Sequence, residues 1–325
     1  MSQFVMGSLA SISKNQRMAA TIMIEQQLPF IEPDETSDWK ETDERILAAE
    51  EKGKVMDAKK IAASAVQTAR KAVEESSKNM GQLLYCLEAR ANLFNRQGDF
   101  RAAESDYVEV LSLATDTEGD ANVDTVSRVY GNLAYLFEAA GEESKAISAY
   151  EDALEHLSNS KEPSVTDQIR FANNLAFIYS ANDDFDQAET LFLKALRAAH
   201  NTFGASAPDS TGVFNNIGAL YQKAGHFDQA REMHAMALDG RKEEGSSLSD
   251  IAQSHGNLAI VYAEQGDEEK SREHFESAIE VFQKAGPQWK EDYDAVCANY
   301  EQLLRNVGDV DGEGRVAALR SQSLS

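Results

Sequence analysis

Residues 174–196, NLAFIYSANDDFDQAETLFLKAL, decide the fold, because their apolar residues follow a helical period on both sides of a short polar break. Three other stretches align with this one without a gap. They are residues 132–154 (NLAYLFEAAGEESKAISAYEDAL), 216–238 (NIGALYQKAGHFDQAREMHAMAL) and 257–279 (NLAIVYAEQGDEEKSREHFESAI). Each copy predicts two helices joined by a tight turn. The repetition predicts an all-α, elongated array of stacked helix pairs.

The turn positions recur at a nearly constant spacing. They are Gly53, Gly98, Gly141, Asp183, Gly225, Gly266 and Gly308, separated by 45, 43, 42, 42, 41 and 42 residues. Glycine, and less readily aspartate, tolerates the left-handed backbone that ends a helix. We predict a superhelical solenoid of about six helix pairs over residues 42–325. Its last pair, with a short second helix over residues 310–319, is predicted to be a cap.

The second helix of each pair carries a predicted core stripe five, nine and twelve residues after the turn. Small residues there allow close helix approach, and an aromatic ring fills the gap between them. The stripes are Ala103, Tyr107, Val110; Ala146, Tyr150, Ala153; Ala188, Phe192, Ala195; Ala230, His234, Ala237; and Ser271, Phe275, Ala278. On the first helices, an aromatic residue four before the turn is also expected in the core: Phe94, Phe137, Tyr179, Tyr221 and Tyr262.

Composition excludes several classes of protein. The formal net charge is −24, with 55 acidic and 31 basic residues, which disfavours nucleic acid as a partner. The two cysteines, Cys86 and Cys297, lie in apolar helical patterns and are expected to be buried free thiols, as in a reducing cytosol. No apolar run is long enough to span a membrane, and no signal peptide is apparent. These features predict a cytoplasmic protein.

Residues 1–41 differ from the repeats. Residues 1–24 contain Lys14 and Arg17 but no acid, so they carry +2 of the formal charge and the remainder carries −26. Apolar residues, including Phe4 and Leu9, recur there at helical spacing. Three interpretations stay open: an amphipathic anchor for a membrane surface or partner, a helix that docks on the array, and a loosely packed leader. Residues 25–44 predict an acidic, proline-containing linker.

The pattern NLAxxYxxxGxxxxAExxxxxAL, as filled by residues 174–196, resembles the tetratricopeptide repeat. The 42-residue period resembles kinesin light chains, and the absence of a preceding coiled coil makes the chain most similar to the bacterial kinesin light chains. That resemblance implies a protein-binding adaptor or scaffold. It also implies a bacterial tubulin-like filament as partner, with association to a membrane as a further possibility.

A ladder of asparagines nine residues before the turn is the predicted binding site. In tetratricopeptide arrays this position faces a concave groove, where an amide offers both a donor and an acceptor to an extended peptide. The predicted groove residues are Arg128, Asn132, Arg170, Asn173, Asn174, Asn215, Asn216, Asn257 and Asn299. Arg128 and Arg170 stand four residues before an asparagine, which resembles a carboxylate clamp. The alternative is that the asparagines bridge neighbouring repeats and the arginines pair with nearby acids.

The acidic linker offers a ligand within the same chain. Phe30 and Trp39, with acids on either side, resemble the peptides that kinesin light chain grooves bind, and a covalent tether would raise their effective concentration. The alternative is that Trp39 packs on the first repeat. The six histidines show no metal-ligand spacing, and no phosphate-binding loop is present, so neither an enzyme nor a cofactor is predicted.

Overall fold

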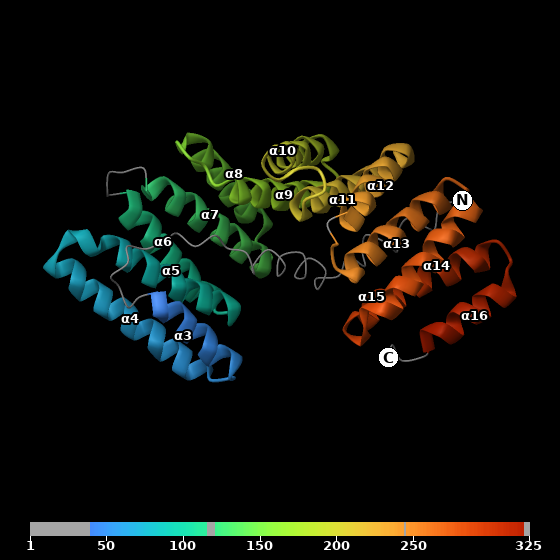
Figure 1. Ribbon diagram of the computed structural model, residues 1–325. Coiled ribbons are helices and arrows are strands. Elements are labelled where there is room, and N and C mark those ends of the chain that lie inside the picture. The colour runs from blue at the N-terminus through green and yellow to red at the C-terminus, as the bar shows by residue number, and fades with distance from the viewer. Residues whose placement is uncertain (1–39, 116–120, 244, 322–325) are drawn as a thin grey trace. The chain divides into compact units, whose positions relative to one another are not determined.

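The computed structural model describes residues 40–115, 121–243 and 245–321, which form fourteen α-helices and no β-strand. Consecutive helices pack as antiparallel pairs (Figure 1). The helices are α3 (Lys40–Glu51), α4 (Val55–Glu75), α5 (Met80–Arg96), α6 (Phe100–Thr115), α7 (Ala121–Ala140), α8 (Glu143–Asn159), α9 (Val165–Ala181), α10 (Phe185–Phe203), α11 (Pro208–Lys223), α12 (Phe227–Glu243), α13 (Leu248–Glu264), α14 (Glu268–Ala285), α15 (Lys290–Asn306) and α16 (Val310–Ser321). Single 3₁₀ turns (Ser77–Asn79 and Pro287–Trp289) precede α5 and α15. The predicted all-α repeat fold is confirmed.

Every predicted turn has the backbone geometry that its residue type favours. The φ angles are positive at Gly53, Gly98, Gly141, Asp183, Gly225, Gly266 and Gly308, from 61° at Asp183 to 78° at Gly225 and Gly308. The N–H of the next residue donates to the carbonyl four residues before the turn, as in Glu142 N to Phe137 O at 2.8 Å. This hydrogen bond satisfies a carbonyl that the ending helix leaves unpaired.

Aspartates directly after several turns begin the second helices. The carboxylates of Asp184 and Asp267 accept hydrogen bonds from the backbone N–H groups of Gln187 and Lys270, both at 3.2 Å. Asp309 accepts from Gly312 N at 2.8 Å. A helix start leaves free N–H groups, and a short acidic side chain satisfies them. The turn and the start of the next helix are therefore encoded together.

The second-helix stripes form the core, as predicted. All fifteen stripe residues are buried, and none is more than 2% exposed. The aromatics of the first helices differ from the prediction. Phe137 is 8% exposed, whereas Phe94, Tyr179, Tyr221 and Tyr262 are only half-buried. The reason is their place beside the turn: the Tyr221 hydroxyl, for example, reaches out to donate to Glu189 Oε1 at 2.7 Å.

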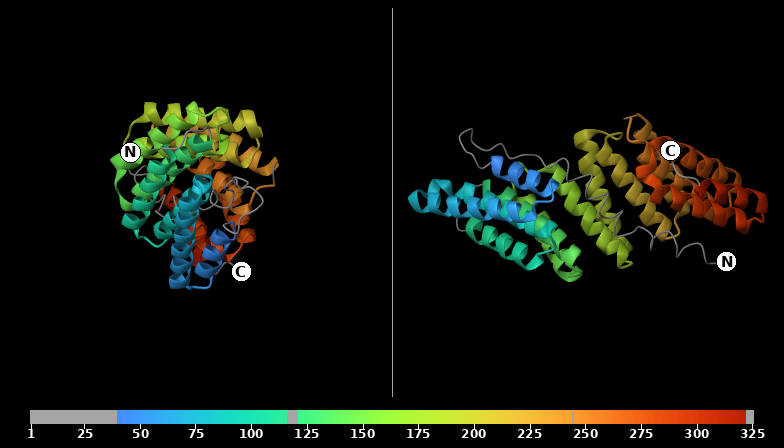
Figure 2. Two further views of the ribbon diagram at one scale, coloured as in Figure 1. Left: turned by 90° about the vertical axis from the view of Figure 1, so that its left-hand side faces the viewer. Right: turned by 90° about the horizontal axis from the view of Figure 1, so that it is seen from below.

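The chain divides into two compact units between Phe171 and Ala172, inside α9. Within each unit, successive helix pairs lie side by side, so each first helix contacts the second helix of the preceding pair (Figure 2). The closing helix α16 is 12 residues long and begins at Val310, in agreement with the predicted short cap. Residues 1–39 lie outside the described residues, so the predicted boundary at residue 41 stays a prediction.

Candidate protein-binding surface

We define the first-helix face as the side chains thirteen, ten and nine residues before each turn. These positions lie on one side of a helix because side chains three and four residues apart are neighbours. Thirteen before the turn stand Tyr85, Arg128, Arg170, Gly212, Gln253 and Ala295; ten before it stand Glu88, Gly131, Asn173, Asn215, Gly256 and Ala298; nine before it stand Ala89, Asn132, Asn174, Asn216, Asn257 and Asn299.

In the unit that ends at Phe171, the carboxylate of Glu88 on α5 bonds to two side chains on the first-helix face of α7. Arg128 donates from Nε and Nη2 to the two oxygens of Glu88, both at 2.7 Å. Asn132 donates from Nδ2 to the Oε1 of Glu88 at 3.2 Å. Arg128 and Asn132 therefore lie together as predicted, and they hold a residue of the preceding repeat.

The carboxylates around Glu88 make this end of the face acidic. Burial raises the pKa of Asp43; Arg96 lowers it, while Glu88 and Glu50 raise it further. Burial also raises the pKa of the Tyr85 hydroxyl, and the nearby Asp43 and Glu88 add to that effect. A second anion is thus unfavourable beside Glu88.

Arg170 pairs differently from Arg128. Its Nη2 lies 2.6 Å from Asp167 Oδ1, one turn earlier on α9, and its guanidinium lies 4.7 Å from the centre of the Phe171 ring. The Nε of Arg170 is buried and has no hydrogen-bond partner. The cause is in the sequence, because the preceding repeat has Gly131 where α5 has Glu88, and glycine offers no acceptor side chain.

In the unit that begins at Ala172, side-chain amides of successive first helices bond to one another on the first-helix face. Asn216 donates from Nδ2 to Asn173 Oδ1, and Asn257 donates to Asn215 Oδ1, both at 2.7 Å. Each bond links the position nine before one turn to the position ten before the preceding turn. For Asn299 the corresponding position of the preceding repeat is Gly256, which has no side chain to accept.

These contacts agree with the alternative that asparagines bridge neighbouring repeats and arginines pair with acids. They do not test peptide binding, which stays a prediction for all nine groove residues. Glu88 is the residue that sequence reasoning missed. Its alignment with Asn173 and Asn215, ten residues before the turn, is the signal that identifies it. The proposed ligands or anchors in the same chain, Phe4, Leu9, Phe30 and Trp39, lie outside the described residues.

The core of the pair α11 and α12 contains polar residues where the other pairs have apolar ones. His234 is fully buried, and neither ring nitrogen has a hydrogen-bond partner. Burial and the charge of Arg241 lower the pKa of His234 to about 3. Arg241 is 8% exposed and donates from Nη1 to Asp250 O at 2.7 Å and Ser254 Oγ at 2.8 Å.

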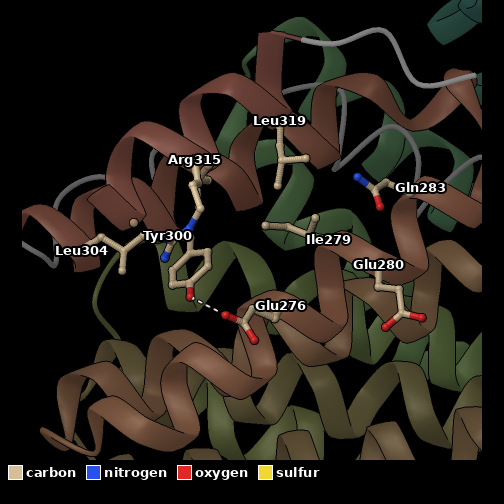
Figure 3. A pocket seen from close by; sticks show the side chains of 10 residues that line it. Glu276, Ile279, Glu280, Gln283, Tyr300, Leu304, Arg315 and Leu319 are labelled. Carbon is tan, nitrogen blue, oxygen red and sulfur yellow. Dashed lines mark hydrogen bonds between the residues drawn. The ribbon is translucent and has the colours of Figure 1, made fainter. Parts of the chain in front are cut away.

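A cavity of about 300 Å³ lies between α14, α15 and α16 (Figure 3). Its floor includes Ile279, Leu304 and Leu319, and its rim carries Glu276 and Arg315. The Tyr300 hydroxyl donates to Glu276 Oε1 at 3.0 Å across one end. This cavity has an apolar floor and a charged rim, as an accessory contact surface does.

The described residues contain no group of three or more His, Cys, Asp or Glu side chains arranged to hold a metal ion. Two histidines, His255 and His274, lie with their Nδ1 atoms 3.0 Å apart. Cys86 and Cys297 are buried free thiols, as predicted, and burial raises the pKa of each to about 11. None of the described helices is long and apolar enough to cross a membrane.

Comparison with known sequences matches the tetratricopeptide-repeat profiles to residues 79–159, 167–243 and 252–284. The matched segments together cover more than half of the 325 residues. The matched segments begin at residue 79, next to the start of α5, and include the first-helix face of α5, α7, α9, α11 and α13. No curated protein matches the sequence.

Comparison with solved structures finds the same arrangement of helix pairs. The crystal structure of BtubC (BKLC) from P. vanneervenii has 27% sequence identity and a TM-score of 0.61, covering 76% of this chain and 91% of that chain. The C-terminal part of a repeat protein from Cytophaga hutchinsonii has 14% identity and a TM-score of 0.57, covering 87% of this chain and 94% of that one. A putative kinesin light chain from Podosopora anserina has 18% identity and a TM-score of 0.52, covering 62% and 95%. The last two show the fold alone.

Proposed function

Because the chain belongs to the tetratricopeptide-repeat family, we propose that it is an adaptor that binds a bacterial tubulin-like filament and links it to another surface. The observation that carries the proposal is the similarity to BtubC, which extends over 91% of that chain. The 42-residue period and the residue pattern of the repeats support it, since both resemble bacterial kinesin light chains. Protein binding without catalysis is what this fold typically provides.

The first-helix face of α11 and α13 is the proposed filament contact. It is neutral and rich in amides, and the bonds from Asn216 and Asn257 use one N–H of each donor and one lone pair of each acceptor. The remaining amide donors and acceptors can bond a partner's backbone or side chains. A surface of this kind binds through hydrogen bonds and shape, which a protein with a net charge of −24 can use without a charge-complementary partner.

Residues 1–24 supply the second contact in this proposal. They combine an acid-free charge of +2 with apolar residues, including Phe4 and Leu9, at helical spacing. Such a segment binds a membrane surface weakly through apolar burial and attraction to anionic lipids. The protein would then be cytoplasmic, with a fraction held at the filament or at the membrane.

A second candidate function is a regulatory module that holds an extended peptide. The observation that favours it is the pair of amide bonds between successive first helices, because side-chain amides offer both donors and acceptors to an extended backbone. In that case a short peptide, rather than a filament lattice, would saturate the first-helix face.

Co-sedimentation tests the proposal. Full-length protein is mixed with the polymerised tubulin-like protein of its host and pelleted at physiological salt. We expect wild type to pellet with the filament and the variant N216A/N257A to lose at least ten-fold in affinity. The matched control Q187A/T190A changes two exposed side chains on α10 and should pellet like wild type. Wild-type protein that stays in the supernatant would rule out the filament and leave the peptide module.

A further inference from the structure

The position of Glu88, ten residues before a turn, accepts a hydrogen bond at three places in the array. The residue ten before one turn accepts from the asparagine nine before the next turn: Glu88 from Asn132, Asn173 from Asn216, and Asn215 from Asn257. Only the first of these acceptors is charged. That acceptor also stands opposite an arginine, Arg128, whereas Gly212 and Gln253 stand at the corresponding positions of the later repeats.

The carboxylate of Glu88 has the surroundings that a bound ligand carboxylate would have. Two parallel N–H···O bonds of 2.7 Å come from the guanidinium of Arg128, and one of 3.2 Å comes from the amide of Asn132. Two parallel bonds of this kind give both strength and a fixed orientation. Glu88 is 7% exposed, so little water competes for these donors.

A ligand from solution would meet two obstacles at this place. Glu88 is attached to the neighbouring helix, and tethering of this kind gives an effective concentration of roughly millimolar or more. A displaced Glu88 would also remain near Asp43, whose pKa is raised by burial and further by the charge of Glu88. An incoming acid therefore replaces one favourable ion pair with another and adds a repulsive charge.

We propose that Glu88 is a specificity-determining residue that fills the carboxylate position of Arg128 and Asn132, so that this part of the first-helix face rejects acidic ligands. The inference rests on the proposed function and deepens it, because it states which partners the face admits. A partner segment over α5 and α7 is neutral or basic. Removal of Glu88 converts the same two donors into a carboxylate-binding site.

The test uses acetate as the probe and the full chain as the protein. Acetate is titrated while the Nε–H resonance of Arg128 is followed by NMR, and its loss in R128K assigns that resonance. In E88A we expect a saturable shift, with an affinity for acetate at least ten-fold tighter than in wild type. The variant E88Q keeps an acceptor for Asn132 and guards against loss of folding in E88A. It should bind acetate more weakly than E88A.

The matched control is E50A. Glu50 also accepts from an arginine, with Arg96 Nε at 3.0 Å and Nη2 at 2.6 Å, and from the amide of Gln97 at 2.8 Å. Arg96 is exposed, so water competes for its donors. E50A should give no saturable shift at Arg96. Equal acetate responses of wild type and E88A would overturn the proposal, as would an E88A response no larger than that of E50A. No filament takes part, so this result is independent of the co-sedimentation result.

Discussion

His234 is the residue at which the array departs most from its own pattern. Tyr107, Tyr150, Phe192 and Phe275 hold the same place in other repeats. Opposite them stands alanine, whereas opposite His234 stands Gly218, where an added Cβ would lie 2.7 Å from the imidazole ring. The two departures fit one another, and the histidine ring fills the space that glycine leaves. Both ring nitrogens are nevertheless without partners.

Replacement of His234 by phenylalanine should stabilise the protein. H234F removes the buried polar atoms of His234 that lack hydrogen bonds, and leaving a buried polar group unsatisfied costs about 1–3 kcal/mol. We expect the free energy of unfolding at pH 8 to rise by about 1–3 kcal/mol in urea titrations. F192H makes the reverse change one repeat earlier and should lower it by a comparable amount. No gain in H234F would indicate that His234 has a partner, such as an ordered water.

The same variant predicts a pH dependence. The pKa of His234 is lowered to about 3 in the folded chain, against about 6.5 when unfolded. The neutral histidine is therefore fully tolerated above pH 6.5, and stability is lost as the pH falls from 6.5 towards 3 because only the unfolded chain takes up the proton. We expect the advantage of H234F over wild type to grow by about 1.4 kcal/mol per unit below pH 6.5.

Comparison with the variant cancels the charge effects that both chains share. His255 and His274 also have lowered pKa values, mainly because burial disfavours their protonation, so wild type and H234F should both weaken in acid. A difference between them that is constant from pH 8 to pH 5 would contradict the assignment.

Gly131 is required by a neighbouring ring. A Cβ there would lie 2.0 Å from the nearest atom of Phe171, whereas Val129, Val213 and Val296 hold the position of Phe171 in other repeats. G131A should therefore cost about 1–3 kcal/mol in thermal or urea unfolding, and the second change F171V should recover part of it. G81A, where a Cβ meets nothing within 4 Å, should be neutral or stabilising.

At the scale of single residues, the sequence predicts structure correctly where a residue type has a single structural role. Turn glycines and buried stripe residues follow from backbone and packing rules. Glu88 escapes those rules because an acidic residue on a helix is usually solvated, and only its partner Arg128, forty positions away, makes it a buried ligand. The half-buried first-helix aromatics are more exposed than the sequence predicts, because periodicity gives the direction of a side chain but not its depth.

At the scale of helices, amide bonds link successive first helices. Asn257 on α13 donates to Asn215 on α11, whereas Asn299 on α15 has a glycine, Gly256, at the corresponding position of the preceding repeat. N257A should cost about 0.5–1.5 kcal/mol in urea unfolding, and N299A should be close to neutral. Equal costs would show that these amides act within their own helices. Loss of partner binding in N299A alone would instead identify a ligand-facing amide.

The second helices of the full repeats are predictable from the sequence, because each follows a turn residue with positive φ and carries a buried stripe. The lateral bonds between first helices are less predictable. Periodicity places the asparagines on one face, but both predicted uses, peptide holding and repeat bridging, need that same face. Only the structure shows that Asn216 and Asn257 each donate one N–H to the preceding repeat.

At the scale of the molecule, the net charge of −24 makes the salt dependence of binding informative. It distinguishes electrostatic attraction from contact through neutral amides. Attraction between opposite charges weakens as salt screens them, whereas contact through neutral amides does not. We expect co-sedimentation with the filament to be unchanged as salt is raised from about 50 to about 300 mM, over which the Debye length falls from roughly 14 Å to about 6 Å. Steep weakening would point to a basic contact, with residues 1–24 as its source.

Mapping the contact tests the account most directly. Backbone hydrogen exchange of the full chain is measured with and without the polymerised tubulin-like protein of its host. The account predicts that slowed exchange concentrates in the first helices, above all α11 and α13, while the second helices α10, α12 and α14 change little. Protection confined to those second helices, or no protection at all, would contradict a first-helix face that binds the filament.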